Sequence, residues 1–256
     1  MRLLPIPGVF QPPSDAVMLA QCLRQEPLGP HTSVLDLCAG SGFLGLSAAS
    51  QGARVTAVDV HWLSLAAVQA NALLNGVRVR TARGDLFDAV AGRRFDYIVS
   101  NPPYLPGPGE APGHGRARAW EAGPRGRMFI DRICARATSH LRSGGVLMLV
   151  HSSVCSIPET VDRLTQQGLE VRIEASQRGP LGPILRARAG WLRSEGLLED
   201  DGTEEMVVIR AQLPMKLSMA DSSAGYPRTD STTEEVSDGQ GPRTEHQERQ
   251  AVRRSA

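Results

Sequence analysis

Between residues 33 and 213, short runs rich in Val, Ile and Leu alternate with longer segments whose apolar residues recur at helical spacing. Strands that alternate with helices of this size predict a parallel sheet with helices on both faces. The predicted strands cover residues 33–38, 54–59, 77–82, 95–100, 146–150, 170–175 and 205–209. We therefore expect one α/β domain, with a doubly wound and mostly parallel sheet of seven strands.

The two ends of the chain differ from this central part. Residues 1–32 contain one predicted helix, from Ser14 to Arg24, and we expect it to pack on the α/β domain of residues 33–213. After Leu213 the composition changes to Ser, Thr, Asp, Glu, Gln, Gly and Arg. Such a segment cannot bury enough apolar surface to offset its ordering entropy, so residues 214–256 are predicted to be a disordered polar tail.

Charge, apolar segments and cysteine spacing exclude several classes of protein. The chain has 28 Lys and Arg against 27 Asp and Glu, which disfavours bulk electrostatic binding to duplex nucleic acid. The apolar run at the N-terminus is too short for a signal peptide and no segment could span a bilayer, so we expect a cytoplasmic protein without membrane contact. The four cysteines form no C-x-x-C pair, which disfavours a metal site and a disulfide framework.

A glycine-rich segment, Gly40-Ser41-Gly42, follows the first predicted strand. Glycines let the backbone pass close to a ligand, and the next helix presents free N–H groups at its N-terminus. Asp59 ends the second strand about twenty residues later, the usual position of a carboxylate that accepts the ribose hydroxyls of a cofactor. The pattern predicts a cofactor that contains ribose.

The segment Gly40–Gly45 also satisfies G-x-G-x-x-G, the weak fingerprint of dinucleotide sites, but other residues favour S-adenosyl-L-methionine. Asp36, inside the first strand, can receive the α-ammonium group of this cofactor. Asp85 follows the third strand and can accept from the adenine amine, while the side chains of Leu86 and Phe87 cover the ring. We therefore predict a methyl donor, not a nicotinamide cofactor.

Asn101, Pro102, Pro103 and Tyr104 follow the fourth strand, at the same predicted sheet edge. Two prolines cannot continue a strand, because neither donates a ladder hydrogen bond and each fixes its own φ. The Asn101 side-chain oxygen and the Pro102 carbonyl become a rigid acceptor pair beside the Tyr104 ring. This arrangement suits a planar NH₂ group that faces a methyl donor, whereas the tetrapeptide alone would equally serve as a rigid turn.

Together these motifs resemble the HemK-type class I methyltransferases, which methylate glutamine side chains of peptide-chain release factors. The resemblance rests on the segments 35–42, 84–86 and 101–104 with Asp59, and it runs from about residue 10 to 210. It implies a Rossmann-like fold, a methyltransferase that uses S-adenosyl-L-methionine, and a cofactor site that includes Cys38, Gly40, Gly42 and Asn101. Cys38 stands where the usual loop has its first glycine.

The resemblance is closer to the short branch of this family, known from archaea and eukaryotes. The chain shares with it a lead-in of Phe10, Pro12 and Asp15, and a second region from Trp120 to Gly126, in which Ala122 departs from the pattern. Relatives in this branch work with a small zinc-binding activator subunit, which the resemblance implies as a partner. Because the bacterial branch grips its substrate with an N-terminal helical bundle, we expect recognition here through residues 105–127, the segment around Trp191 or another subunit.

Two other functions stay open at this point. The same acceptor pair would fit the exocyclic amine of adenine or guanine in DNA or RNA, with the base extruded into the pocket. The second alternative is an inactive cofactor-binding scaffold for a partner protein, although a scaffold has no need of the Asn101–Tyr104 tetrapeptide.

Overall fold

The computed structural model describes residues 1–6, 9, 14–109, 120–198 and 202–215. Its central sheet has seven strands in the order β3-β2-β1-β4-β5-β7-β6, and the first five of these positions are linked by parallel pairs. β7 runs antiparallel to both β5 and β6. The strands are β1 Ser33–Leu37, β2 Arg54–Asp59, β3 Val79–Arg83, β4 Phe95–Ser100, β5 Leu141–Ser152, β6 Glu170–Pro180 and β7 Thr203–Gln212. The predicted mostly parallel sheet of seven strands is confirmed.

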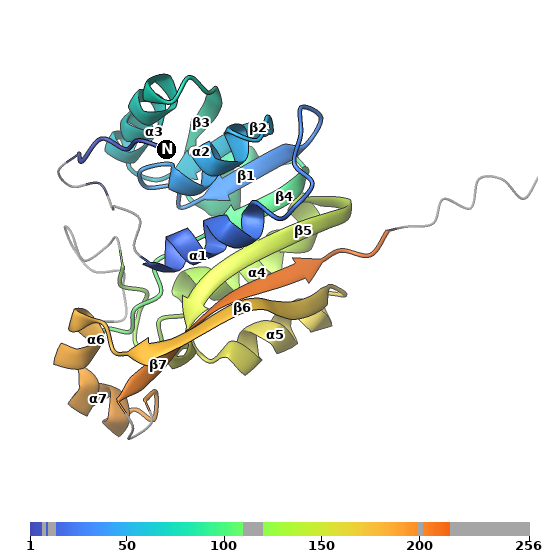
Figure 1. The fold of residues 1–256 in the computed structure, drawn as a ribbon. Coiled ribbons are helices and arrows are strands. Elements are labelled where there is room, and N and C mark those ends of the chain that lie inside the picture. Colours follow the sequence, from blue (N-terminus) through green and yellow to red (C-terminus); the bar gives the residue numbers. More distant parts are fainter. Residues whose placement is uncertain (7–8, 10–13, 110–119, 199–201, 216–256) are drawn as a thin grey trace, which may run out of the picture. The chain divides into compact units, whose positions relative to one another are not determined.

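Helices cover both faces of the sheet (Figure 1). One face carries α1 Ser14–Leu23, α2 Phe43–Ala49 and α3 Trp62–Leu74, and the other carries α4 Met128–His140 and α5 Ile157–Gln166. Two short helices, α6 Pro183–Ala187 and α7 Ala189–Ser194, lie between β6 and β7, and two 3₁₀ turns occupy Leu86–Val90 and Ser153–Cys155. The doubly wound arrangement predicted from the sequence is therefore present.

The last three strands are longer than the apolar runs that predict them. β5 covers Leu141–Ser152, whereas its apolar run covers only residues 146–150. β7 pairs with β5 as far as Ser152 and with β6 as far as Pro180. Backbone hydrogen bonds of the antiparallel ladder therefore extend β6, β7 and the C-terminal end of β5 through polar residues that hydrophobic periodicity does not detect.

Burial divides the core into two clusters, one on each face of the sheet. In β1 the side chain of Val34 belongs to the cluster under α1–α3, and Leu35 and Leu37 belong to the cluster under α4 and α5. This alternation places Asp36 on the same face as Val34, beneath α2. A carboxylate is thus built into the core at the sheet centre.

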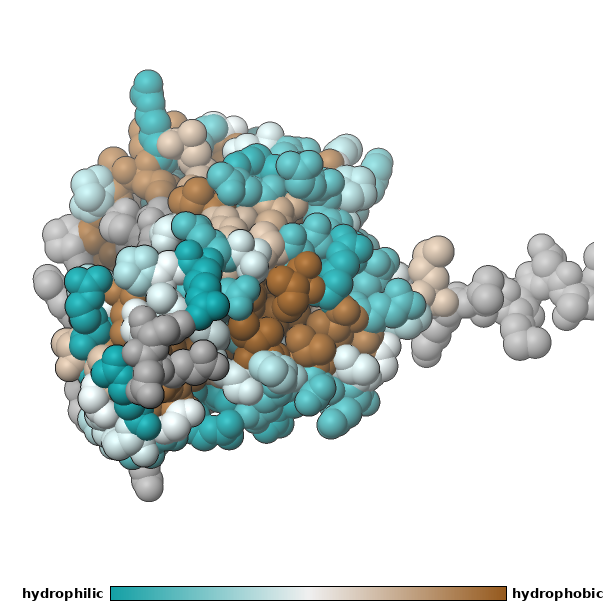
Figure 2. Space-filling model, turned by 60° about the horizontal axis from the view of Figure 1, so that its bottom comes forward, coloured by the Kyte–Doolittle hydropathy of each residue, from teal (hydrophilic) through white to brown (hydrophobic). Residues whose placement is uncertain are grey.

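The β6 edge of the sheet is less covered than its centre. Nearly all residues of β1 and β4 are buried, whereas β6 has no fully buried residue and leaves the side chain of Ile173 43% exposed. Figure 2 turns the lower part of the molecule forward and shows hydrophobic residues gathered among polar ones in the middle of that face. The burial pattern follows strand position, because an edge strand has a neighbour on one side only.

All described residues belong to one compact unit, Met1–Lys216. Of the predicted polar tail, residues 216–256 lie outside the described residues. In the described part of the chain, no helix is both long enough and apolar enough to cross a membrane.

Candidate active site

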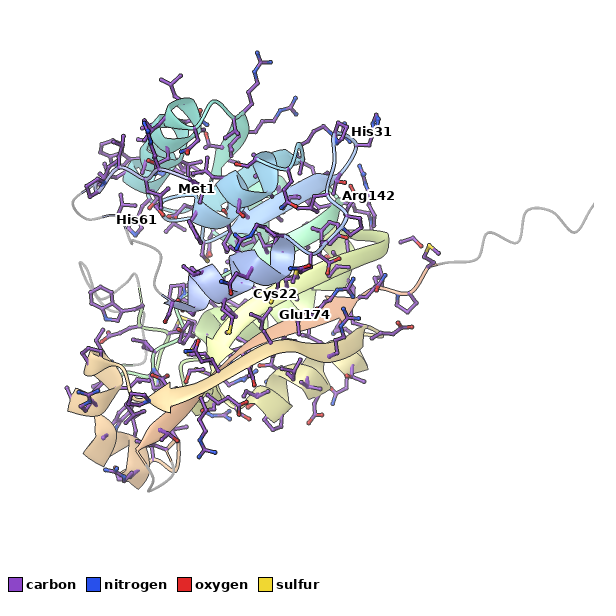
Figure 3. The ribbon with its side chains drawn as sticks, in the orientation of Figure 1. Met1, Cys22, His31, His61, Arg142 and Glu174 are labelled. Atoms are coloured by element: carbon purple, nitrogen blue, oxygen red, sulfur yellow. The ribbon has the colours of Figure 1, made fainter. Side chains whose placement is uncertain are left out.

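The predicted site residues meet at one edge of the sheet. In the parallel register Asp36 lies opposite Ala57 and Leu37 opposite Ser100, so the loops that follow β1, β2, β3 and β4 leave the sheet on the same side. His61, just beyond β2, marks this edge in Figure 3, and His31 and Arg142 mark the opposite edge. The sequence correctly predicts which ends of the strands come together.

The loop after β1 is held by a carboxylate and by backbone contacts. Asp59 accepts the N–H of Gly40 on Oδ2 at 3.0 Å and the N–H of His61 on Oδ1 at 2.9 Å. The Asn71 side chain of α3 donates to the carbonyl of Ser41 at 2.9 Å. The loop is therefore fixed to β2 and α3 before any ligand binds.

Asp36 is almost fully buried, with an exposed fraction of 1%. Its Oδ2 accepts the N–H of Gly45 in the first turn of α2 at 2.8 Å, and a Cβ on Gly45 would crowd this oxygen. Burial raises the pKa of Asp36 to about 7; the Gly45 N–H opposes this rise and the negative charge of Asp59 adds to it. A cation near Asp36 would favour its ionised form.

The Cys38 thiol lies within the electrostatic influence of three carboxylates. Burial raises the pKa of the Cys38 thiol, and the charges of Asp59, Asp36 and Asp85 raise it further. Cys38 and Leu86 both have a left-handed backbone, with φ of 58° and 49°. Because that conformation is costly for residues with a side chain, strain is stored at this edge of the sheet, as is common at functional sites.

The charge pattern of this edge indicates which ligands fit. Asp85 pairs with Arg132 at 2.7 Å, whereas Asp36 and Asp59 accept only backbone N–H groups among the described residues. A negative, acceptor-rich site fits a cationic ligand that carries amine and hydroxyl donors. A pyrophosphate would face uncompensated carboxylates, so the residues present do not suit a dinucleotide.

One predicted contact is wrong. Phe87 is fully buried and stacks on the ring of His140 with centroids 4.3 Å apart, so its side chain cannot cover a bound adenine. The chain enters a 3₁₀ turn at Leu86, which directs Phe87 into the core under α4. The side chain of Leu86 is itself only 4% exposed, and its role in the cofactor site stays a prediction.

The described cysteines are not candidates for nucleophilic catalysis. All four thiols are free, and burial raises the pKa of each, to about 12 for Cys134. Cys22 on α1 lies close to Glu174 on β6 (Figure 3), whose negative charge adds to the rise at Cys22. Thiols with such pKa values hold their protons at neutral pH.

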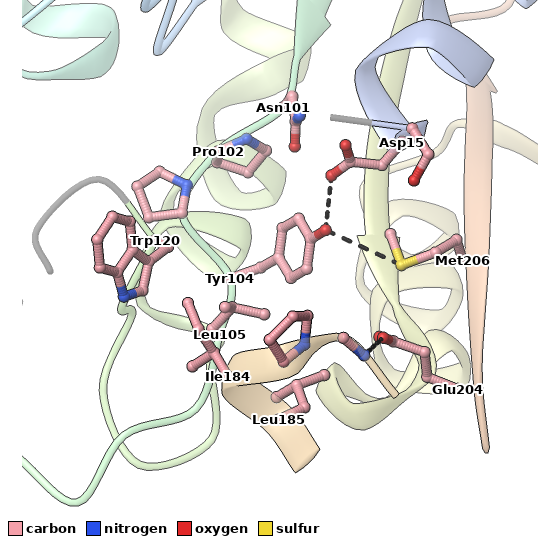
Figure 4. Close-up of a pocket in the computed structure, with 14 residues that line it drawn as sticks. Asp15, Asn101, Pro102, Tyr104, Leu105, Trp120, Ile184, Leu185, Glu204 and Met206 are labelled. Atoms are coloured by element: carbon pink, nitrogen blue, oxygen red, sulfur yellow. Dashed lines mark hydrogen bonds between the residues drawn. The ribbon is translucent and has the colours of Figure 1, made fainter. Parts of the chain in front are cut away.

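A cavity of about 240 Å³ opens beyond the end of β4 (Figure 4). Its walls come from five separate parts of the chain, which contribute Asn101–Leu105, the start of α1, Trp120, the start of α6 and the start of β7. Apolar side chains form most of this lining, with a few polar groups between them. The cavity has the composition expected of a small binding site.

Asn101 and Pro102, the predicted acceptor pair, both line this cavity. The amide of Asn101 points into the cavity in Figure 4, and among the described residues no group hydrogen-bonds to it. Pro102 is buried beside it. The catalytic roles of Asn101, Pro102, Pro103 and Tyr104 stay predictions, but this geometry leaves the Asn101 side chain available to a ligand.

Tyr104 has a partner that sequence reasoning missed. Its hydroxyl donates to Oδ2 of Asp15 at 2.6 Å and lies 3.9 Å from the sulfur of Met206. Asp15 is only 5% exposed. Burial raises the pKa of Tyr104 well above its ordinary value, and the charge and hydrogen bond of Asp15 raise it further, so the phenol keeps its proton.

Residues of the Trp120–Gly126 segment and Cys155 contact the backbone of Tyr104 and Leu105. Its carbonyl accepts the thiol of Cys155 at 2.9 Å, and Leu105 donates to the carbonyl of Trp120 at 2.7 Å. Gly126, with φ of 68°, lies against the same carbonyl, and any Cβ there would collide with it. The Trp120–Gly126 segment therefore needs a glycine at this point to support the tetrapeptide.

Glu204 joins the other walls of the cavity. Its oxygens accept the hydroxyl of Ser152 at 2.7 Å and the N–H of Gly182 at 2.9 Å, which links β5, β7 and the start of α6. Sequence reasoning did not identify Glu204, because its partners are far away along the chain. For Asp15 a signal did exist, since it belongs to the Phe10–Asp15 lead-in.

Comparison with known proteins gives consistent matches. The family model "Methyltransferase small domain" matches residues 5–114. A protein named as an N5-glutamine methyltransferase from Methanocaldococcus jannaschii is 30% identical over 181 residues, which cover 70% of this chain and 90% of that protein. The release factor glutamine methyltransferase of Geobacter sulfurreducens is 35% identical over 153 residues, 56% of this chain, and this chain spans only 53% of its length.

A solved structure shows the same fold. It is the E. cuniculi Mtq2–Trm112 complex, which is responsible for the methylation of the translation termination factor eRF1. The match has 21% sequence identity and a TM-score of 0.57, and it covers 80% of this chain and 99% of that one.

Proposed function

Because the chain belongs to the family of protein N5-glutamine methyltransferases, we propose that it transfers a methyl group from S-adenosyl-L-methionine to the side-chain amide of a protein glutamine. The observation that carries this proposal is that the Asn101–Tyr104 pocket opens at the same edge of the sheet as the carboxylates of Asp36, Asp59 and Asp85. That edge would combine a site for a cationic cofactor with a pocket for an NH₂ group.

The cofactor would be held by the loops after β1, β2 and β3. Asp36 would receive its ammonium group, Asp59 its ribose hydroxyls and Asp85 its adenine amine. The backbone of residues 38–42 and the turn at Leu86 would approach it closely, since both already adopt left-handed conformations. When bound, S-adenosyl-L-methionine supplies an electrophilic methyl group on a cationic sulfur.

The acceptor would be an amide nitrogen, which is a poor nucleophile because its lone pair is delocalised. The oxygens of Asn101 and Pro102 would accept its two N–H groups and turn the nitrogen toward the methyl carbon, with the Tyr104 ring packed on the amide plane. As the N–C bond forms, the bond between the methyl carbon and the cofactor sulfur would break, positive charge develops on the nitrogen, and its N–H donors become stronger; one of these protons is then lost to water. The same two acceptors stabilise the transition state more than the ground state.

The proposed substrate is a peptide-chain release factor, because relatives of this chain are named for that substrate. We also propose a small activator subunit as partner, since the structural neighbour Mtq2 forms a complex with Trm112. The near-neutral charge of the chain supports a protein substrate over a nucleic acid.

An assay with methyl-labelled cofactor tests this proposal without choosing a substrate in advance. The purified protein is incubated with a cell lysate, and label is measured separately in the protein and nucleic-acid fractions. Label on glutamine side chains supports the proposal. Label confined to adenine or guanine would replace it with nucleobase methylation, and no transfer to any fraction would favour an inactive scaffold.

A further inference from the structure

The described lining of the acceptor cavity carries negative charge and no positive charge. It contains two carboxylates, Asp15 and Glu204, and no basic side chain among the described residues that form it. Asp15 forms no ion pair with any described residue and is 5% exposed. A buried carboxylate without a cation beside it requires an explanation, because the desolvation of its charge is costly.

The two carboxylates have different surroundings. Glu204 uses its oxygens to join Ser152 on β5 to Gly182 before α6, which is a structural role. Asp15 accepts the N–H of Ala16 on Oδ1 at 2.7 Å and the phenol of Tyr104 on Oδ2 at 2.6 Å. Only Asp15 is therefore joined directly to the tetrapeptide that holds the acceptor.

We propose that Asp15 is a positioning residue of the acceptor site, which acts through Tyr104 and lowers the energy of the positive charge that develops on the attacking nitrogen. The inference rests on the proposed function, because it assigns a role within that same reaction. Asp15 fixes the phenol, and the phenol fixes the plane of the ring on which the acceptor amide packs. Its charge remains in the wall of the cavity, where little water weakens its effect.

This role predicts a separation between binding and turnover. The acceptor amide is neutral in the ground state and gains positive charge only as the methyl group is transferred. The charge of Asp15 therefore favours the transition state over the bound substrate, and its loss lowers kcat more than it raises KM. A residue that merely supported the fold would not produce this split.

The test compares Asp15→Asn, Asp15→Ala and Tyr104→Phe with the wild-type enzyme, using a recombinant release factor as methyl acceptor. Asp15→Ala is expected to lower kcat about a hundredfold, because both the charge and the anchor of the ring are lost. Asp15→Asn keeps an oxygen that accepts from Tyr104, so it should recover part of this loss and remain about tenfold below wild type. KM for the release factor should stay within about threefold in both variants.

Asp162→Asn is the matched control, since Asp162 is exposed on α5 outside the cavity, and it should behave as wild type. Affinity for the cofactor, measured by calorimetry, should be unchanged in every variant. Wild-type kcat in both Asp15 variants would overturn the inference. A loss of kcat with a parallel loss of cofactor affinity and thermal stability would also overturn it, because it would show a purely structural role.

These outcomes can be told apart from failure of the proposed function. If the wild-type enzyme methylates a nucleobase amine and no glutamine, the proposed function fails. The same Asp15 variants are then compared on that acceptor, where their kcat and KM still decide the role of Asp15.

Discussion

The two halves of the proposed active site, a cofactor side and an acceptor side, are held together by contacts that span different distances along the chain. On the cofactor side, Asp36 holds Gly45 and Asp59 holds Gly40, pairs that are 9 and 19 residues apart. On the acceptor side, Tyr104 bonds to Asp15 and contacts Met206, which are 89 and 102 residues away. Contacts between residues close in the sequence therefore shape the cofactor side, whereas contacts between distant parts of the chain shape the acceptor side.

The largest expected effect is that of Asn101→Ala, which removes one acceptor of the NH₂ group. If the halves are independent, turnover falls about a hundredfold or more, the scale of one transition-state hydrogen bond, while cofactor affinity changes little. Single-turnover kinetics and calorimetry with S-adenosyl-L-methionine measure the two quantities. If Asn101→Ala lowered turnover and cofactor affinity by the same factor, the cofactor side and the acceptor side would not be independent.

Gly126→Ala tests the close contact between Gly126 and the Tyr104 carbonyl on the acceptor side. The added Cβ collides with the Tyr104 carbonyl and the backbone has a positive φ, so we expect a loss of about 2 kcal/mol in the free energy of unfolding. Urea denaturation measures this loss, and Gly76→Ala is the control, since Gly76 shares the positive φ but has open space around it. Equal losses in the two variants would mean that the collision contributes nothing.

Asp36→Asn tests the cofactor side through pH. The folded-state pKa of about 7 lies above the ordinary 3.8, so this group stabilises the fold fully below pH 3.8 and loses that contribution as the pH rises through 7. Between pH 6 and pH 8 it should lower the free energy of unfolding by about 1.4 kcal/mol. Urea denaturation at both pH values should show this drop in wild type and not in Asp36→Asn; identical pH slopes would contradict the assignment.

The smallest effect is expected for Cys38→Gly, also on the cofactor side. Glycine adopts the left-handed backbone of residue 38 without strain, so the variant should gain about 0.5–1 kcal/mol in the free energy of unfolding. Cys38→Ala keeps a Cβ and should gain nothing, which makes it the control. A gain in both variants would locate the effect in the thiol and not in the backbone.

The fold was largely predictable, because its signals are local. Apolar runs such as Phe95–Ser100 and Arg54–Asp59 coincide with β4 and β2 at both ends. The edge at which the site residues meet could also be predicted, because the loops that follow parallel strands leave the sheet on the same side. The full length of β5 could not be predicted, since its ends are polar or glycine-rich and are defined by pairing with β4 and β7, which apolar periodicity does not report.

The acceptor pocket was only half predictable. Asn101 and Pro102 follow a strand directly, so their place at the carboxyl edge of the sheet could be inferred from the sequence. The contributions of Asp15 and Glu204 depend on where α1 and β7 pack, which no periodicity in the sequence encodes. The direction of Phe87 could not be predicted, because the 3₁₀ turn at Leu86–Val90 has three residues per turn and the sequence does not show where this turn begins.

The most direct test of the account is to locate the transferred methyl group. Purified wild-type enzyme and Asn101→Ala are incubated with a release factor and labelled S-adenosyl-L-methionine, and the products are sequenced by tandem mass spectrometry. We expect one methyl group on the side-chain nitrogen of a glutamine with the wild type and almost none with the variant. A methyl group on another type of residue, or equal transfer by Asn101→Ala, would contradict the account.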